Sequence, residues 1–252
     1  MTSAVSVRDP GLDSPEAVQR KAYMRRLFGF QARHYDLHDD IIGLGVHRLW
    51  VRDMVAVIRG FMKDRAGARM LDLACGTGFV TFNVARTVKN IEIDAFDITP
   101  EMVAVAKERA RRNGQQINFW VGDAELPYGE SKYDIVATCF AFRNFANKAL
   151  AVDNMMRALV PGGMLVIQDM TKPERQPWRG VYLFALGHLM PLVAAIIGTE
   201  RKAPRYLYNS VMAMPPNGDI LNLLLEKGFI NLSCKNQTLG MGTIVVGYRP
   251  EG

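Results

Sequence analysis

The chain has 252 residues, of which 49% are hydrophobic, with a formal net charge of +6 and a pI near 9.3. This length and composition predict one large domain with a sizeable core. Three widely spaced cysteines, Cys75, Cys139 and Cys234, argue against a disulfide framework and for a reducing compartment. No Cys/His spacing indicates zinc, so no metal site is expected. The positive charge permits an acidic partner such as anionic lipid, RNA or phosphate, although solvated helix faces explain most of the scattered basic residues.

Residues 1–14 are polar and lack an apolar stretch, so we expect a disordered leader and no signal peptide. The Ser-Pro-Glu start at Ser14 predicts a helix to about residue 28. Helical periodicity returns over residues 50–61. We therefore expect residues 15–62 to form a helical cap over the mouth of a sheet, and residues 15–252 to form a single domain.

The central motif is MLDLACGTGFV at residues 70–80. An apolar run there predicts a buried strand, which stops at Gly76-Thr77-Gly78 and leads into a helix over residues 79–88. Glycines at this point allow a ligand to approach the backbone and the first N–H groups of the helix. Asp72 falls late in the strand, where a carboxylate can hold a cationic or hydroxyl-bearing ligand. The third glycine of the dinucleotide motif and the Lys-Ser/Thr of a phosphate loop are absent. On its own, such a turn is equally compatible with a connection that binds nothing.

Strand and helix patterns then alternate, which predicts an α/β fold with a mostly parallel sheet. Further strands are expected over residues 91–96, 117–121, 133–140 and 164–169, with helices over 100–112 and 148–159. Pro161-Gly162-Gly163 predicts a sharp turn before the fifth strand. A last helix over residues 216–228 and a hairpin over 229–236 and 242–248 bring the predicted sheet to seven strands.

Polar groups follow four consecutive strands of this predicted sheet. They are the glycine turn, Asp97, the Asp123-Ala124 pair and the loop from Cys139 to Asn144. Asp97 lies 19 residues after Gly78, where an acidic residue can bind the two hydroxyls of a ribose. Ligands of open parallel sheets bind at the carboxyl ends of the strands, so the sequence predicts a nucleoside-type cofactor site.

Residues 181–198 are nearly free of charge and approach the length of a membrane span, although His188 and Pro191 interrupt them. Two interpretations remain open. The segment is either a helical insertion packed on the domain, within a wider insertion at residues 174–215, or a surface for a greasy substrate or a membrane interface. The neighbouring Arg201-Lys202 and Arg205 favour the second interpretation slightly.

From about residue 28 to residue 248, the chain resembles the ubiquinone/menaquinone-biosynthesis C-methyltransferases, which are class I methyltransferases dependent on S-adenosylmethionine (SAM). The glycine motif and the Pro-Gly-Gly are shared by many class I enzymes, whereas Gly-x-His-Arg-x-Trp and Phe-Arg-Asn are more diagnostic. The matching segments are Tyr35-Asp36, residues 45–50, 71–78, 122–127, 142–144, 159–163, 172–173 and 205–210. Small departures are Phe79 after the glycine motif and Asp169 where the family usually has Glu.

The resemblance implies a Rossmann-like fold and methyl transfer from SAM to a ring carbon of a polyprenylated quinol. It also implies a set of cofactor contacts, which on this sequence are Asp72, Gly76, Thr77, Gly78, Asp97, Ile98, Asp123, Ala124 and Cys139. The sequence does not distinguish a naphthoquinol from a benzoquinol.

Three residues are candidates for the reaction itself. Arg143 would hold a developing oxyanion, because guanidinium stays charged and offers several donors; its alternative is a loop arginine paired with a surface carboxylate. Asn144 would fix a second oxygen or cap the following helix. Tyr35 would close over the cofactor or bind the quinol, unless it only packs at a helix start. No general base is obvious, so the proton is expected to leave through water, assisted by Tyr35, Asp36 or Asp169.

Other function classes share this fold. An RNA or protein methyltransferase fits the net charge, but no basic stripe with interleaved aromatic residues appears, so no nucleic-acid partner is expected. The remaining alternatives are methylation of another small hydrophobic metabolite and a nucleoside-binding regulatory subunit without chemistry. We expect a cytoplasmic protein attached peripherally to the inner face of the membrane, and leave a homodimer open.

Overall fold

A computed structural model describes residues 14–32, 45–63, 65–196 and 202–252. Its centre is one seven-stranded sheet with the strand order β3-β2-β1-β4-β5-β7-β6. The strands are β1 (Ala68–Leu73), β2 (Ile91–Asp97), β3 (Asn118–Val121), β4 (Tyr133–Cys139), β5 (Leu159–Met170), β6 (Ile230–Gln237) and β7 (Gly242–Tyr248). Strands β1 to β5 pair in parallel, whereas β7 runs antiparallel to both of its neighbours. The predicted seven-stranded, mostly parallel sheet is confirmed.

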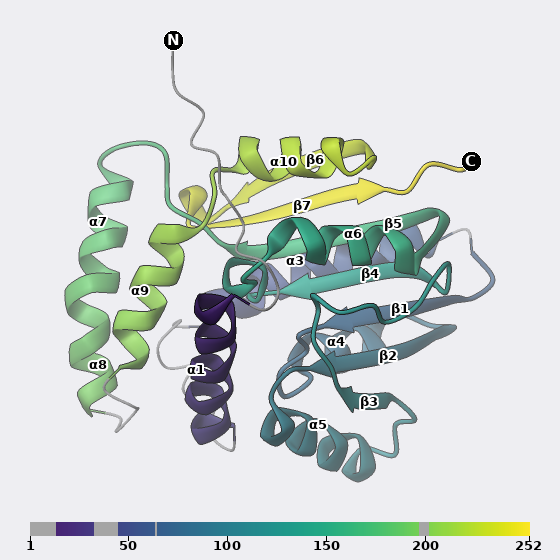
Figure 1. Cartoon of the computed structure of the whole chain (residues 1–252), viewed down its shortest axis with the longest axis horizontal. Helices are drawn as coiled ribbons and strands as arrows, with labels where there is room; N and C mark the ends of the chain where they lie inside the picture. Colours follow the sequence, from purple (N-terminus) through teal and green to yellow (C-terminus); the bar gives the residue numbers. More distant parts are fainter. Residues whose placement is uncertain (1–13, 33–44, 64, 197–201) are drawn as a thin grey trace.

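Helices cover both faces of the sheet (Figure 1). Helices α3, α4 and α5 pack on one face, where their apolar side chains meet β1, β2 and β3. Helices α6 and α10 pack on the other face. The helices are α1 (Pro15–Gln31), α3 (Val46–Phe61), α4 (Phe79–Thr87), α5 (Pro100–Arg112), α6 (Lys148–Ala158), α7 (Trp178–Phe184), α8 (Met190–Ile196), α9 (Ala203–Ala213) and α10 (Asn217–Glu226), with the short turns η1 (Phe142–Asn144), η2 (Ala185–Leu189) and η3 (Thr238–Gly240).

The carboxyl ends of β1, β2 and β4 point toward α1, and α7, α8 and α9 lie beyond them on the same side (Figure 1). The two helices of the predicted cap therefore differ in position. Helix α1 lies at the strand ends, but α3 packs on a face of the sheet. The reason is the apolar stripe of α3, in which Val51, Met54, Val55 and Ile58 follow helical spacing and are all buried. Residues 1–13 of the predicted leader lie outside the described residues.

Pro161-Gly162-Gly163 does not form the predicted sharp turn before the fifth strand but lies within β5. The pairing of β4 with β5 shifts between Tyr133 and Ile135, and Gly162 takes a φ of 71°. On the opposite side of β5, two backbone hydrogen bonds pair the glycines with the residue after β7: Gly162 N donates to Arg249 O, and Arg249 N donates to Gly163 O. The glycines thus form a bulge in a strand that continues on both sides.

The insertion predicted at residues 174–215 contains one helical run, α7-η2-α8, followed by α9. The central five residues, η2, are π-helical and precede Pro191, which has no N–H to donate within the helix. Among the described residues this run, Trp178–Ile196, is the one helix whose length and composition would allow it to cross a membrane, and only 17% of its apolar window is buried. Tyr182, Leu186 and Val211 form a small core between the run and α9.

Candidate active site

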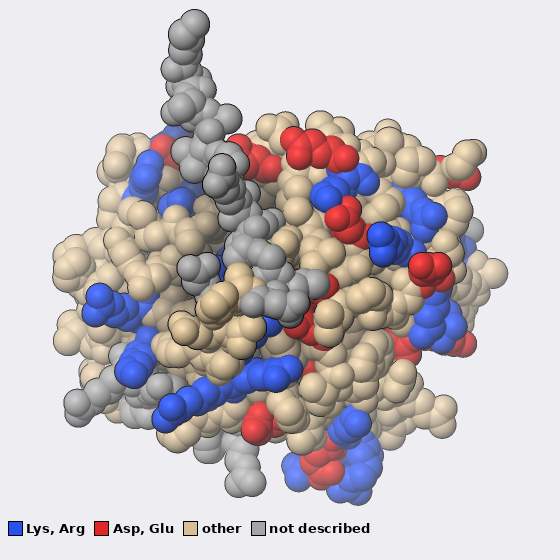
Figure 2. Space-filling model, in the orientation of Figure 1, with Lys and Arg blue, Asp and Glu red and all other residues tan. Residues whose placement is uncertain are grey.

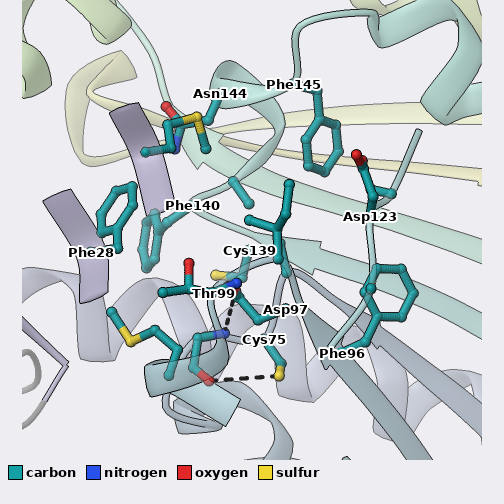
Figure 3. A pocket seen from close by; sticks show the side chains of 18 of the residues that line it. Phe28, Cys75, Phe96, Asp97, Thr99, Asp123, Cys139, Phe140, Asn144 and Phe145 are labelled. Carbon is teal, nitrogen blue, oxygen red and sulfur yellow. Dashed lines mark hydrogen bonds between the residues drawn. The ribbon is translucent and has the colours of Figure 1, made fainter. Parts of the chain in front are cut away.

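A pocket opens at the carboxyl ends of the strands, where the loops after β1, β2, β3 and β4 meet α1 (Figure 3). It is lined by most of the residues singled out from the sequence. These are Gly76, Thr77, Asp97, Ile98, Asp123, Ala124, Cys139 and Asn144. The convergence follows from the parallel strand order, because β1 lies between β2 and β4 and their ends share one edge.

The glycine turn after β1 has a backbone conformation that residues other than glycine rarely adopt. Gly76 and Gly78 have φ values of 56° and 84°, in the left-handed region. A Cβ on Gly78 would also lie 2.7 Å from Cε2 of Phe82. The turn is fixed to the end of β2, because Gly76 N donates a hydrogen bond of 2.9 Å to Asp97 Oδ2.

Asp97 is buried at the end of β2 and organises both neighbouring loops. Its Oδ1 accepts a second backbone hydrogen bond, from Thr99 N at 2.8 Å. Burial raises the pKa of Asp97, while the N–H donors of Thr99 and Gly76 act in the opposite direction. The Thr99 side chain and the backbone of Ile98 also lower the pKa of this carboxyl group. Asp97 lines the pocket, so its carboxylate lies where the ribose of a nucleoside ligand would bind.

Asp72 and Gly78 are not among the lining residues. Asp72 is buried behind the turn, where it accepts a hydrogen bond from the Thr81 hydroxyl of α4. Burial raises the pKa of Asp72 to about 7. The position of Asp72 supports the glycine turn from behind, and a direct contact with the cofactor remains a prediction.

Helix α1 contributes lining residues that the sequence did not reveal. Lys21 Nζ lies 2.8 Å from Asp123 Oδ2 and 2.9 Å from Glu125 Oε2, so one ammonium joins α1 to the loop after β3. Burial acts to lower the pKa of Lys21, but the hydrogen bonds to Asp123 and Glu125 outweigh it and the pKa is raised. Arg25 Nε donates to Ile98 O at 3.1 Å. In the sequence, the basic pair Arg25-Arg26 is the feature of this helix that could indicate a binding role, and a solvated helix face explains such a pair equally well.

Arg143 is buried beside the pocket rather than lining it. Its guanidinium forms an ion pair with the fully buried Asp169 of β5, and its Nε donates to Ser210 Oγ of α9 at 3.3 Å. Its backbone N also donates to Asp169 Oδ2 at 2.8 Å. Arg143 is therefore paired with a carboxylate, as its alternative interpretation supposed, but with a buried one at the end of β5.

Asn144 lines the pocket, and its Oδ1 accepts a hydrogen bond of 2.8 Å from the Tyr206 hydroxyl of α9. The alternative of a helix cap is wrong, because Asn147 caps α6: its side chain accepts from Leu150 N at 2.8 Å. Tyr35, the third candidate, lies outside the described residues, as does Asp36.

Most of the remaining lining is apolar and aromatic, although His47, Thr99 and Glu125 also line the pocket. The apolar side chains come from α1, α4, β2, α5 and the loop after β4, and Figure 3 shows several of their rings around the cavity. They are Met24, Phe28, Phe79, Val80, Phe96, Met102, Phe140 and Phe145. A largely apolar pocket with carboxylates just after β2 and β3 fits an adenosyl group, whose base needs stacking surfaces and whose ribose offers hydroxyl donors. No cluster of His, Cys, Asp and Glu that could hold a metal ion occurs in the described ranges.

Comparison with known proteins gives consistent results. The model of the ubiE/COQ5 methyltransferase family matches residues 16–249. The chain is 30% identical over 247 residues to the ubiquinone/menaquinone biosynthesis C-methyltransferase UbiE of Shewanella piezotolerans, covering 95% of each chain. It is 26% identical over 249 residues to the demethylmenaquinone methyltransferase of Porphyromonas gingivalis, covering 94% of this chain and all of the other. A phosphoethanolamine N-methyltransferase from Haemonchus contortus, solved with S-adenosylhomocysteine, shares the fold with a TM-score of 0.60, at 16% identity over 79% of this chain and 52% of that one.

Proposed function

Because the chain belongs to the ubiE/COQ5 methyltransferase family, it is a SAM-dependent C-methyltransferase, and we propose that it methylates a ring carbon of a polyprenylated quinol. One observation carries this proposal: a match along 95% of both chains to a protein named for C-methylation in quinone biosynthesis. The fold alone would not distinguish these substrates from others, because class I methyltransferases act on many.

When bound, SAM supplies an electrophilic methyl group on a sulfonium. The carboxylate of Asp97 would accept hydrogen bonds from the ribose hydroxyls. Asp123 would bind the adenine edge, since its carboxylate stands at the end of β3 on the pocket wall. Thr77, Ala124 and Cys139 would complete the cofactor contacts. The ammonium of Lys21 compensates part of the negative charge of Asp123 and Glu125 and so lowers the cost of burying these carboxylates under a ligand.

The main task of the protein is to align a ring carbon with the methyl group, which can supply roughly 7–11 kcal/mol of the barrier. Ring carbons next to a hydroxyl become more nucleophilic as that hydroxyl loses its proton, so donors near the ring oxygen accelerate the step. Asn144 is the candidate donor to the ring oxygen in this scheme, because its side chain lines the pocket after β4. Arg143 would stabilise the oxyanion through its fixed charge, although Asp169 shares that charge. The proton would leave through water.

We also propose that the α7-η2-α8 run attaches the protein to a membrane surface. Large apolar side chains protrude from it, among them Phe184, Leu192 and Ile196, which are 57%, 63% and 84% exposed. In Figure 2 the surface over α7 and α8, on the left, is mostly uncharged with Lys and Arg at its edges. Arg179 belongs to α7 and Arg205 to the adjacent α9. An exposed apolar face with basic edges suits anionic lipid, and a membrane would bring the long-tailed quinol to the site.

The direct test is transfer of labelled methyl from SAM by the purified protein. The acceptors would be demethylmenaquinol, a demethylated benzoquinol and RNA, each presented with and without vesicles. The proposal predicts label on a quinol ring carbon, identified by mass spectrometry, and none on RNA. Label on RNA alone, or on another hydrophobic metabolite in a cell extract, would refute it. Attachment at the inner face of the membrane and a homodimer are further proposals, which fractionation and sedimentation velocity test.

A further inference from the structure

Tyr206 of α9 lies at a junction between three parts of the molecule. Its hydroxyl donates a hydrogen bond of 2.8 Å to Oδ1 of Asn144, which lies in η1, the turn after β4. Its ring centroid lies 5.6 Å from that of Tyr23 and 6.2 Å from that of Phe28, both on α1. Phe28 and Asn144 both line the pocket, so Tyr206 contacts its wall from behind at two points.

The hydrogen bond fixes which end of the Asn144 amide is available to a ligand. An amide has one oxygen acceptor and one NH2 donor group. The oxygen is engaged by Tyr206, which leaves the Nδ2 group for the pocket. Burial raises the pKa of Tyr206, so its hydroxyl stays protonated and remains a donor at neutral pH.

A second contact of α9 reaches the same turn. Ser210 Oγ accepts a hydrogen bond of 3.3 Å from Arg143 Nε. Tyr206 and Ser210 are four residues apart and therefore share one face of α9. This face of α9 forms hydrogen bonds to two consecutive residues of η1, Arg143 and Asn144.

We propose that Tyr206 is a positioning residue for methyl transfer: it holds Asn144 with the Nδ2 group facing the pocket as a donor to the ring oxygen. This inference rests on the proposed function, since the ring oxygen belongs to the quinol. The adjacent carbon attacks from the ionised form of the quinol, in which this oxygen carries negative charge, and the attack draws electron density from the oxygen toward the methyl group. A fixed N–H donor favours that ionised form over the neutral quinol and so raises the fraction of substrate that can react. An amide turned by 180° would instead present its oxygen and disfavour the ionised form.

The test is a double-mutant cycle between Tyr206→Phe and Asn144→Ala, with Tyr208→Phe as the matched control on the same helix. Removing the Tyr206 hydroxyl should lower kcat about five- to tenfold, with unchanged KM for SAM and an unchanged melting temperature. In the Asn144→Ala background the same change should cost less than twofold, because its effect passes through Asn144. Tyr208→Phe should leave kcat unchanged. Equal losses in both backgrounds, or no loss in either, would overturn the proposal.

A measurement without substrate separates this inference from the proposed function. The side-chain NH2 signals of Asn144, identified by their disappearance in Asn144→Ala, report on the environment of the amide whose oxygen accepts the hydrogen bond from Tyr206. We expect these signals to shift in Tyr206→Phe, which keeps the ring but removes the donor, and to stay in place in Tyr208→Phe. If the signals are the same in Tyr206→Phe and the wild type, the positioning role is refuted, even for an enzyme that methylates quinols. If they shift but no quinol is methylated, the role of Tyr206 in holding Asn144 stands and the substrate assignment fails.

Discussion

Replacing Asp97 with Asn should separate cofactor binding from folding. The change keeps the shape of the side chain but replaces one carboxylate oxygen with an NH2 group. That group must face either Gly76 N or Thr99 N, both of which are donors. The variant also loses the negative charge and one acceptor for the ribose hydroxyls.

The expected effect on SAM affinity follows from the lost interaction. A hydrogen bond to a charged group contributes about 1.5–3 kcal/mol, so Kd should rise by roughly 10- to 150-fold. Stability should change much less, because burial already raises the pKa of Asp97 and removing a buried charge offsets part of the lost hydrogen bonding.

Isothermal titration calorimetry with SAM measures the affinity, and thermal unfolding without ligand measures the stability. Glu92→Gln, an acid-to-amide change at an exposed position on the same strand, is the control and should bind SAM like the wild type. A Kd for Asp97→Asn within twofold of the wild type would refute the assignment of Asp97 to the ribose.

Three further predictions concern stability and membrane attachment. Asp72 has a folded-state pKa of about 7 against an ordinary 3.8, so its ionisation opposes folding. Stability should fall as pH rises from about 4 to 7, by up to about 4 kcal/mol, and urea titrations of Asp72→Asn should lack this fall. Gly78→Ala should lower the free energy of unfolding by at least about 2 kcal/mol, since Ala disfavours its φ and the new Cβ meets Phe82. Phe184→Ser with Leu192→Ser should weaken flotation with anionic vesicles at least tenfold, since burying each side chain contributes about 1.5–3 kcal/mol.

Matched controls make these outcomes decisive. Gly114 also has a positive φ, of 62°, but a Cβ there meets nothing within 4 Å, so Gly114→Ala should cost less than Gly78→Ala. Equal losses would show that contact with Phe82 is unimportant. Leu225→Ser removes an exposed leucine from α10, away from the proposed membrane face, and should leave vesicle binding unchanged. For Asp72, parallel pH profiles of the variant and the wild type would contradict the assigned pKa.

Much of the fold was accessible from the sequence because its signals are local. Each short apolar run that we predicted to be a strand is one, and the parallel order then brings Asp97, Asp123 and the loop after β4 together. The prediction of a turn at Pro161-Gly162-Gly163 was wrong because both glycines pair with Arg249, which follows β7 and is remote in sequence.

The parts of the site that sequence reasoning missed depend on contacts between distant side chains. Lys21 lies 102 residues before Asp123, and nothing in the pattern of α1 indicates that pairing. The same holds for Tyr206, which was matched as part of the segment 205–210 without a role. For Asp72, the position late in β1 was evident from the sequence, but the direction of the side chain was not. That side chain points toward Thr81 because β1 packs against α4.

The most direct test of quinol methylation is the quinone profile of cells that lack this protein. Our account predicts that a demethylated quinone accumulates, that the wild-type gene restores the methylated form, and that Asp97→Asn restores it only in part. An unchanged quinone pool in the deletion strain would contradict the account.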